Sequence, residues 1–279
     1  MSLIRITEHC QGFYEHRYDM AAASRIHGNL DVPLLEYHDL TIREQLQNQF
    51  HNEVAALVAL DHLESVPKLL DVDPEWLTLT CEDLGATRRS PEARDIPAAM
   101  EMLSCIHETW NRAEPNFRDV FHAVVDQGFY FEERDGLRAH DHGEFGDLLR
   151  DVPSIIEGAS VLPRRCQHGD VNGSNIFIAD RGVCLIDFED VSVSFQMMDV
   201  VGVLWHLGWS DERYLRFDSW ISAWSEYESA ASNDGDFREF LYCVIRWTCK
   251  WLAKRVRPEG EFRAQAGLSL AAYSELRAL

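Results

Sequence analysis

Short runs of alternating hydrophobic and polar residues dominate the first 85 residues, where β-prone positions near the N-terminus and the run 76–80 favour strands. Thr41 stands three positions before Glu44, which is the spacing of a helix capping box. The apolar residues that follow recur with a nearly helical period to about Leu63. The pattern predicts a small α+β N-terminal lobe over residues 1–85, built from strands, one helix and further strands.

Helical periodicity dominates the rest of the chain. Helices are expected over the segments 96–110, 117–157 in part, 217–231 and 240–256. The exception is 175–188, where the β-prone runs 176–178 and 183–186 flank the turn-forming Asp180-Arg181-Gly182 and predict a β-hairpin. We therefore expect an α+β chain in which residues 86–279 form a mostly helical C-terminal lobe.

The charge balance restricts the partners. Lys and Arg total 26 against 47 Asp and Glu, a net charge of −21. Such an acidic chain is a poor candidate for binding nucleic acid or an anionic membrane surface, and it tends to attract cations, including cationic small molecules. Solubility or a salt-adapted host would explain the acidity equally well, because net charge does not locate charge.

The number of cysteines and the lengths of the apolar stretches bear on the cellular compartment of the protein. The seven cysteines are odd in number and contain no Cys-x-x-Cys pair, which favours buried, reduced thiols. The first ten residues lack the apolar stretch of a signal peptide, and no run approaches the roughly 20 apolar residues that span a bilayer. The expectation is a cytoplasmic protein.

The segment from Cys166 to Phe188 carries the candidate chemistry. A hairpin folds back on itself, so Asn175 before the first strand and Asp187 after the second should lie together, with Asp170 a short loop away. Mg²⁺ prefers oxygen ligands such as the Asn175 amide and the Asp187 carboxylate, and it shares them with substrate phosphates. Phosphoryl transfer also needs a carboxylate on the attacking hydroxyl, for which Asp170 is the candidate.

The motif His168-Gly169-Asp170-Val171-Asn172-Gly173-Ser174-Asn175, followed by Ile186-Asp187, resembles the catalytic loop and metal-binding aspartate of aminoglycoside phosphotransferases, and choline kinase and homoserine kinase are similar. The resemblance implies a bilobal protein-kinase-like fold. It also implies an ATP-dependent, Mg²⁺-dependent phosphotransferase that acts on a small-molecule hydroxyl.

The same resemblance implies further roles. Glu82 and Leu84 stand where the hinge between lobes would bind adenine through backbone groups. Asp199 matches an aspartate that opens the next helix and braces the catalytic loop. His107 matches a histidine of the first large-lobe helix, although we favour a satisfied core histidine for it.

The small lobe departs from the family pattern, which pairs a third-strand lysine with a helix glutamate to hold the nucleotide phosphates. Glu53 is a candidate for the glutamate, but the first lysine of the chain is Lys68, and Glu36 aligns with the lysine position. Either Arg25 or Arg43 replaces the lysine, or the lobe is remodelled, or nucleotide binding is impaired. A misplaced strand register would also explain the mismatch.

Three functions follow from these residues: a small-molecule phosphotransferase, a nucleotide-binding pseudokinase or regulator, and an enzyme that transfers another part of the nucleotide. An acidic, aromatic acceptor pocket would suit an amine-bearing or quaternary ammonium compound. Its candidate residues are Glu132, Glu133, Asp135, Asp211, Glu212, Trp205, Trp209, Trp220 and Trp224. For most of them, a buried tryptophan core and a solvated acidic face are the favoured reading.

Overall fold

The computed structural model describes residues 5–10, 13–21, 33–34, 37–84, 89–112, 146–208, 211–230, 237–254 and 259–279. Two compact units form by packing, and both are discontinuous in sequence. The N-terminal unit consists of Met1–Ser90, Thr109–Asp126 and His168–Val193. The C-terminal unit consists of Pro91–Glu108, Gln127–Gln167 and Ser194–Leu279. The expected lobes, 1–85 and 86–279, follow chain order, whereas the loop and hairpin 168–193 pack with the first 90 residues.

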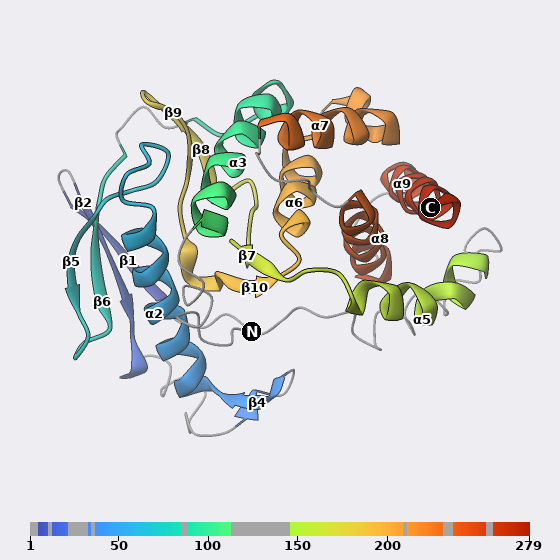
Figure 1. Cartoon of the computed structure of the whole chain (residues 1–279). Coiled ribbons are helices and arrows are strands. Elements are labelled where there is room, and N and C mark those ends of the chain that lie inside the picture. The colour runs from blue at the N-terminus through green and yellow to red at the C-terminus, as the bar shows by residue number, and fades with distance from the viewer. Residues whose placement is uncertain are drawn as a thin grey trace. The chain divides into compact units, whose positions relative to one another are not determined.

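An antiparallel sheet of order β1-β2-β6-β5 forms the N-terminal unit (Figure 1). Its strands are β1 (Arg5–Cys10), β2 (Phe13–Tyr18), β5 (Leu69–Asp73) and β6 (Thr78–Glu82). The short strands β3 (Pro33–Leu34) and β4 (Tyr37–Thr41) pair separately. On β6 the buried Leu79 and Cys81 alternate with half-buried neighbours, as the pleat of a strand requires.

Helix α2 (Ile42–Ala59) packs against β2 and β5. The predicted capping box is confirmed: the Thr41 hydroxyl accepts from the Glu44 amide at 3.2 Å, and the Thr41 amide donates to Glu44 Oε2 at 2.8 Å. Its buried face is only partly apolar. The buried residues are Ile42, Gln45, Leu46, Gln49, Phe50, Asn52, Glu53, Ala56 and Leu57. Such polar side chains on an inner face need partners within the protein.

The predicted hairpin is formed by β8 (Ile176–Ala179) and β9 (Gly182–Leu185). Its register pairs Ile176 with Leu185 and Ala179 with Gly182, which leaves Asp180 and Arg181 as the turn. Gly182 adopts a φ of 113°, a backbone conformation that residues with a Cβ atom rarely adopt. The short 3-10 helix η4 (Phe188–Asp190) follows and contacts α2.

The C-terminal unit is mostly helical, as predicted. Helix α3 spans Ile96–Arg112, and its residues up to Glu108 belong to this unit. The other helices are α5 (Gly146–Ser160), α6 (Met197–Gly208), α7 (Phe217–Ala230), α8 (Phe237–Lys254) and α9 (Glu259–Ala278). The 3-10 helix η1 (Ala93–Asp95) precedes α3, and the 3-10 helix η5 (Glu212–Leu215) lies between α6 and α7 in sequence. The short strands β7 (Arg165–Gln167) and β10 (Ser192–Ser194) precede and follow the loop and hairpin. Helices α8 and α9 lie side by side (Figure 1).

Tryptophans form part of this helical core. Trp205 and Trp220 are fully buried, and Trp224 is half-buried. The prediction that these tryptophans are core residues is therefore confirmed for Trp205 and Trp220. Trp209 lies outside the described residues.

Most of the described cysteines are buried. Cys81, Cys166, Cys184 and Cys243 are free and buried, while Cys105 is free but exposed, so the expectation of burial is wrong for Cys105. None of the helices in the described ranges has the length and apolar character to cross a membrane.

A buried chain of polar contacts links three helices of the C-terminal unit. His107 on α3 lies 2.9 Å from Asp199 on α6 through Nε2 and 2.8 Å from the Tyr227 hydroxyl on α7 through Nδ1. Burial, and then the charges of Asp199 and Glu239, raise the pKa of Tyr227, so its hydroxyl stays protonated and donates to His107. The histidine can then donate from Nε2 to Asp199. The prediction of a satisfied core histidine is confirmed.

We predict that Tyr227→Phe lowers the free energy of unfolding by about 1–3 kcal/mol, because the buried Nδ1 of His107 loses its donor while the ring volume is kept. Urea titration measures the change. Tyr214→Phe, at a half-buried tyrosine of the same unit, is the control and should stay within about 0.5 kcal/mol of wild type. Equal small effects of both variants would contradict the prediction.

Candidate active site

The loop between β7 and β8 is held by a buried histidine. His168 Nε2 lies 3.0 Å from the Ile186 carbonyl oxygen, and His168 Nδ1 lies 3.3 Å from the Asp170 amide. A carbonyl only accepts and an amide N–H only donates, so the hydrogen bonds assign a neutral ring with its proton on Nε2. The imidazole thereby ties the start of the loop to the end of the hairpin.

A glycine lets the loop approach the segment after the hairpin. Gly169 has a φ of +87°, and a Cβ placed there would overlap the backbone carbonyl oxygen of Asp190. Only glycine accommodates both the left-handed backbone and this contact.

Two asparagines fix the side chain of Asp170. Asn172 Nδ2 donates to Asp170 Oδ2 at 2.9 Å. Asn175 Nδ2 donates to the same oxygen at 3.0 Å and to the Asp170 carbonyl at 2.9 Å. With its NH₂ group on Asp170, Asn175 directs its amide oxygen to the other side, where Ser174 Oγ lies at 3.3 Å. In this orientation the amide oxygen of Asn175 is suited to act as a metal ligand.

Hairpin pairing brings Asn175 and Asp187 together. The Ile186 amide donates to the Asn175 carbonyl at 3.0 Å, and Asp187 is the next residue. Asp187 adopts the left-handed conformation, with φ 71° and ψ 63°, which costs about 1 kcal/mol or more for a residue other than glycine. The two predicted metal ligands thus lie at the open end of one hairpin, Asn175 before β8 and Asp187 after β9.

Asp170, Asp187 and Asp190 form a group that we call the aspartate cluster. Burial raises the pKa of Asp170, and the charge of Asp187 adds to the rise. Burial also raises the pKa of Asp190 to about 6, despite a hydrogen bond from Gln49, and the charges of Asp170 and Asp187 contribute. Carboxylates that raise one another's pKa in this way favour a bound cation.

The donor set fits magnesium held jointly with substrate. Within the described ranges, no group of three or more His, Cys, Asp or Glu side chains is arranged to hold a metal ion. Mg²⁺ usually takes one or two protein carboxylates and completes its octahedron with waters and substrate phosphates. Asn175 and Asp187 would supply one amide and one carboxylate oxygen to such an ion.

Helix α2 is attached to the segment that follows Asp187. Gln49 Nε2 donates to Asp190 Oδ1 at 3.1 Å, and Asn52 Nδ2 donates to the Val191 carbonyl at 3.0 Å. Sequence reasoning missed both residues. Their one signal is their place on the inner face of an amphipathic helix, where amides are unusual.

Glu53, on the same face of α2, is paired with the sheet. His16 Nδ1 lies 3.2 Å and 3.4 Å from the two Glu53 oxygens, and the Tyr18 hydroxyl donates to Oε2 at 2.5 Å. Both partners are on β2. The sequence analysis did not single out either residue.

Of the two arginines proposed to replace the lysine, Arg43 lies among the described residues and Arg25 does not. Glu36 and Arg25 lie outside the described residues. Arg43 is exposed and stands ten residues before Glu53 on α2, which is about 15 Å along the helix axis. Its contact with nucleotide stays a prediction.

Arg181, at the turn of the hairpin, binds the segment predicted to be the hinge. Its guanidinium donates to Glu82 Oε2 at 3.2 Å and 3.3 Å and to the Val66 carbonyl at 3.3 Å. The Glu82 amide donates to the Lys68 carbonyl at 2.9 Å, so it is engaged within the sheet. The sequence pattern predicted Arg181 only as a turn residue and did not predict its contacts with Glu82 and Val66.

Leu84, a residue of the predicted hinge, packs on the hairpin. It belongs to a buried cluster with Phe177, Ala179 and Cys184, against which Ile186 packs. Beyond the hinge, Arg89 and Ile178 exchange backbone hydrogen bonds of 3.2 Å and 3.1 Å. The hinge segment is therefore attached to the hairpin on both sides of Leu84.

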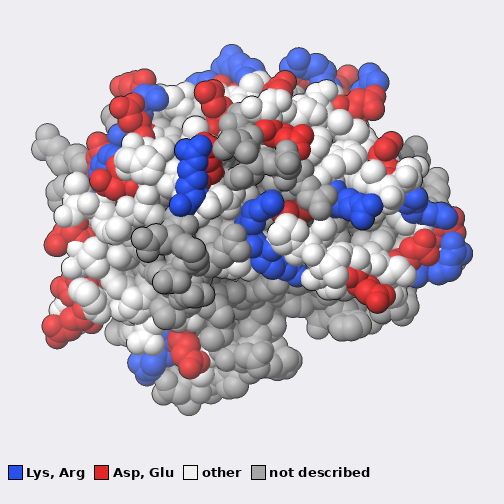
Figure 2. Space-filling model, viewed as in Figure 1, with Lys and Arg blue, Asp and Glu red and all other residues white. Residues whose placement is uncertain are grey.

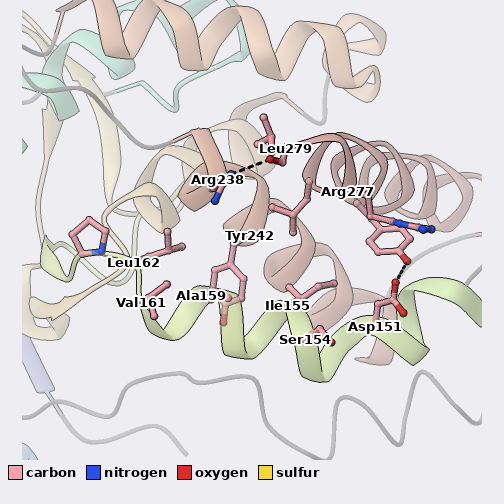
Figure 3. Close-up of a pocket in the computed structure, with 14 residues that line it drawn as sticks. Asp151, Ser154, Ile155, Ala159, Val161, Leu162, Arg238, Tyr242, Arg277 and Leu279 are labelled. Atoms are coloured by element: carbon pink, nitrogen blue, oxygen red, sulfur yellow. Dashed lines mark hydrogen bonds between the residues drawn. The ribbon is translucent and has the colours of Figure 1, made fainter.

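A separate cavity of about 580 Å³ lies in the C-terminal unit, between α5, α8 and α9 (Figure 3). Tyr273 donates to Asp151 at 2.5 Å, and Arg238 donates to the Leu279 carbonyl at 3.0 Å across it. The lining residues are Asp151, Ser154, Ile155, Gly158, Ala159, Val161, Leu162, Pro163, Arg238, Tyr242, Tyr273, Leu276, Arg277 and Leu279. They include none of the residues predicted from the sequence to form the site.

Of the acidic candidates for an acceptor pocket, Asp211 and Glu212 lie among the described residues. Glu132, Glu133 and Asp135 lie outside the described residues. Asp211 is paired with Arg213, whose Nε donates to Asp211 Oδ2 at 2.9 Å. On the face seen in Figure 2, acidic and basic side chains are interspersed among the residues that are described.

Comparisons with known proteins define the class. A model of the phosphotransferase enzyme family matches residues 40–236. The chain belongs to this family and is accordingly a small-molecule kinase, a phosphotransferase with a hydroxyl acceptor. A comparison with curated proteins gives no significant match.

Solved structures share the protein-kinase-like fold at low identity. Choline kinase LicA from Streptococcus pneumoniae superposes with a TM-score of 0.53 at 13% identity, over 99% of this chain and 90% of that one. A choline/ethanolamine kinase family protein from Mesorhizobium loti gives 0.54 at 11% identity, over 100% and 87%. Aminoglycoside 2′-phosphotransferase-IIIa gives 0.52 at 11% identity, over 99% and 91%.

The raised pKa of Asp190 predicts a pH-dependent effect of Asp190→Asn in metal-free protein. Because the pKa is about 6 in the folded state against 3.8 for the ordinary group, ionisation penalises the folded state above pH 6 and not below about pH 4. The variant should be more stable than wild type at pH 7.5 by at most about 3 kcal/mol, and the gain should shrink as the pH falls.

Urea titrations at pH 7.5 and pH 4.5 in EDTA measure this difference. Asp180→Asn, at an exposed aspartate in the hairpin turn, is the matched control with no expected gain. A gain from Asp190→Asn that is independent of pH, or a loss at pH 7.5, would contradict the assignment.

Proposed function

We propose that this protein transfers the γ-phosphoryl group of ATP to a hydroxyl group of a small molecule, with Mg²⁺ as the metal. The observation that carries the proposal is the hydrogen-bonded pair of Asp170 and Asn175, with Asp187 held beside Asn175 by the hairpin. One carboxylate for the acceptor and two oxygen ligands for a metal are the protein groups that this chemistry needs.

Asp170 acts as the base. It orients the acceptor hydroxyl and takes its proton as the oxygen attacks the γ-phosphorus and the bond to ADP breaks. Asn172 and Asn175 hold its carboxylate in place. Asn175 and Asp187 would hold the metal ion, which would supply positive charge to the phosphates.

The nucleotide base lies against the hinge. We assign its backbone contacts to the segment from Glu82 to Leu84, and its apolar floor to Leu84, Phe177 and Ile186 of the hairpin cluster. Structural neighbours support a nucleotide site: LicA has been solved with AMP, and amicoumacin kinase hAmiN with AMP-PNP and Ca²⁺.

The acceptor is an amine-bearing or quaternary ammonium small molecule. The net charge of −21 favours cations. The names of the neighbours support the same class, since they include choline, glucosamine and aminoglycoside kinases. The free thiols of the described cysteines and the need for ATP fit a cytoplasmic location.

A second candidate is a pseudokinase or regulator that binds nucleotide without turnover. It is favoured by one observation, that His16 rather than a lysine stands beside Glu53. Product analysis with ATP, Mg²⁺ and a panel of amino alcohols and amino sugars separates the candidates. ADP and a phosphorylated acceptor support the kinase, AMP transfer contradicts it, and binding without product favours the regulator.

Asp170→Asn should lower kcat by about 10²–10⁴, the usual effect of losing a general base, because the amide keeps the shape and cannot accept the proton. Steady-state kinetics with a coupled ADP assay measures the loss. ATP affinity, measured by calorimetry, should change little. A defect confined to nucleotide binding would remove Asp170 from this role.

Asp187→Ala should abolish Mg²⁺-dependent turnover while the fold is retained, because one of two protein ligands to the metal is lost. The readouts are the same kinetics across a Mg²⁺ series and the melting temperature. Asp180→Ala, in the turn of the same hairpin, is the matched control. Near-normal activity of Asp187→Ala would show that the metal is held elsewhere.

A further inference from the structure

The carboxylate of Glu53 is one of the most deeply buried charged groups of the N-terminal unit. Only 1% of Glu53 and 3% of His16 is exposed. A buried carboxylate is stable only when it is hydrogen-bonded and its charge is balanced. Tyr18 supplies a hydrogen bond at 2.5 Å, and His16 faces both oxygens at 3.2 Å and 3.4 Å.

This buried pair lies close to the aspartate cluster. Gln49, one helical turn before Glu53, donates to Asp190, and Asn52, the residue before Glu53, donates to the Val191 carbonyl. One turn of helix is about 5.4 Å. The same face of α2 therefore carries the Glu53–His16 pair and the contacts to the segment after Asp187.

Phosphates bound beside the aspartate cluster need positive charge from the protein as well as from a metal ion. Two basic side chains described on neighbouring elements, Lys68 and Arg17, contact other groups. Lys68 Nζ lies 3.9 Å from Asp61 and 3.5 Å from the Leu63 carbonyl. Arg17 follows His16 on β2, hence on the opposite face of the sheet, and lies 3.6 Å from Asp19.

We propose that His16 supplies the positive charge that holds the nucleotide phosphates, and that Glu53 and Tyr18 position its ring. The inference rests on the proposed function, because it assigns a role at the same nucleotide site. A protonated imidazole carries the charge that a lysine would carry, and a buried charge is screened less than an exposed one. His16 is a phosphate-binding residue in this account, and Glu53 and Tyr18 are the positioning residues because they act through its ring.

Calorimetric titration with MgATP and with adenosine tests the proposal, because only the first ligand carries phosphate. His16→Gln should weaken MgATP binding by about tenfold to a hundredfold and leave adenosine binding unchanged. His16→Lys should restore the MgATP affinity at least in part. His51→Gln, at an exposed histidine of α2, is the matched control and should bind both ligands like wild type.

Removal of His16 leaves Glu53 buried without this partner, so a second variant protects against misfolding. The double variant His16→Gln/Glu53→Gln carries no buried charge at this position, and it should also lose affinity for MgATP relative to adenosine. The melting temperature of each variant reports on folding.

Each outcome decides between the two proposals. If wild type binds no nucleotide, the proposed function fails and this inference fails with it. If wild type binds MgATP and both glutamine variants bind it equally well, only the role of His16 is overturned. Equal losses for MgATP and adenosine, or a folded His16→Lys variant that binds MgATP no better than His16→Gln, would likewise overturn it.

Discussion

The hydrogen bond from the Ile186 amide to the Asn175 carbonyl is the contact on which the site depends. It closes the β8–β9 hairpin at the end where the loop enters, so Asp187 follows directly beside Asn175. His168 strengthens the same closure through the Ile186 carbonyl, and Asn175 in turn holds Asp170. One antiparallel pairing therefore sets the positions of three side chains that are separated by up to 17 residues in the sequence.

Charge balance governs the surroundings of this loop. Burial is the main reason why the pKa of Asp190 is raised to about 6, and the charges of Asp170 and Asp187 add to the rise, so ionising the whole aspartate cluster without a cation is costly. From helix α2, the neutral amide of Gln49 donates to Asp190, and Asn52 donates to the neighbouring Val191 carbonyl. The carboxylate of Glu53, on the same helix, faces His16 and Tyr18 on β2. A divalent cation would balance the charge that the aspartate cluster leaves negative, and the anionic phosphates of a nucleotide could then bind to it.

The sequence predicted the features that depend on neighbouring residues. The capping box of Thr41 and Glu44 and the hairpin around Asp180 are local, so spacing alone defines them. Contacts across the fold were not predictable in this way. His16 meets Glu53 because β2 pairs with β6 and α2 packs on the sheet, and neither pairing leaves a mark in the spacing of residues. Arg181 was visible as a turn residue, whereas its bonds to Glu82 and Val66 arise from tertiary packing.

The central claim is that the loop and hairpin bind a nucleotide through a shared divalent cation. Calorimetric titration of ATP into the wild-type protein, once with excess Mg²⁺ and once with EDTA, tests it most directly. The account predicts saturable binding with Mg²⁺ and clearly weaker binding with EDTA. Absence of ATP binding in Mg²⁺, or equal affinity under both conditions, would contradict it.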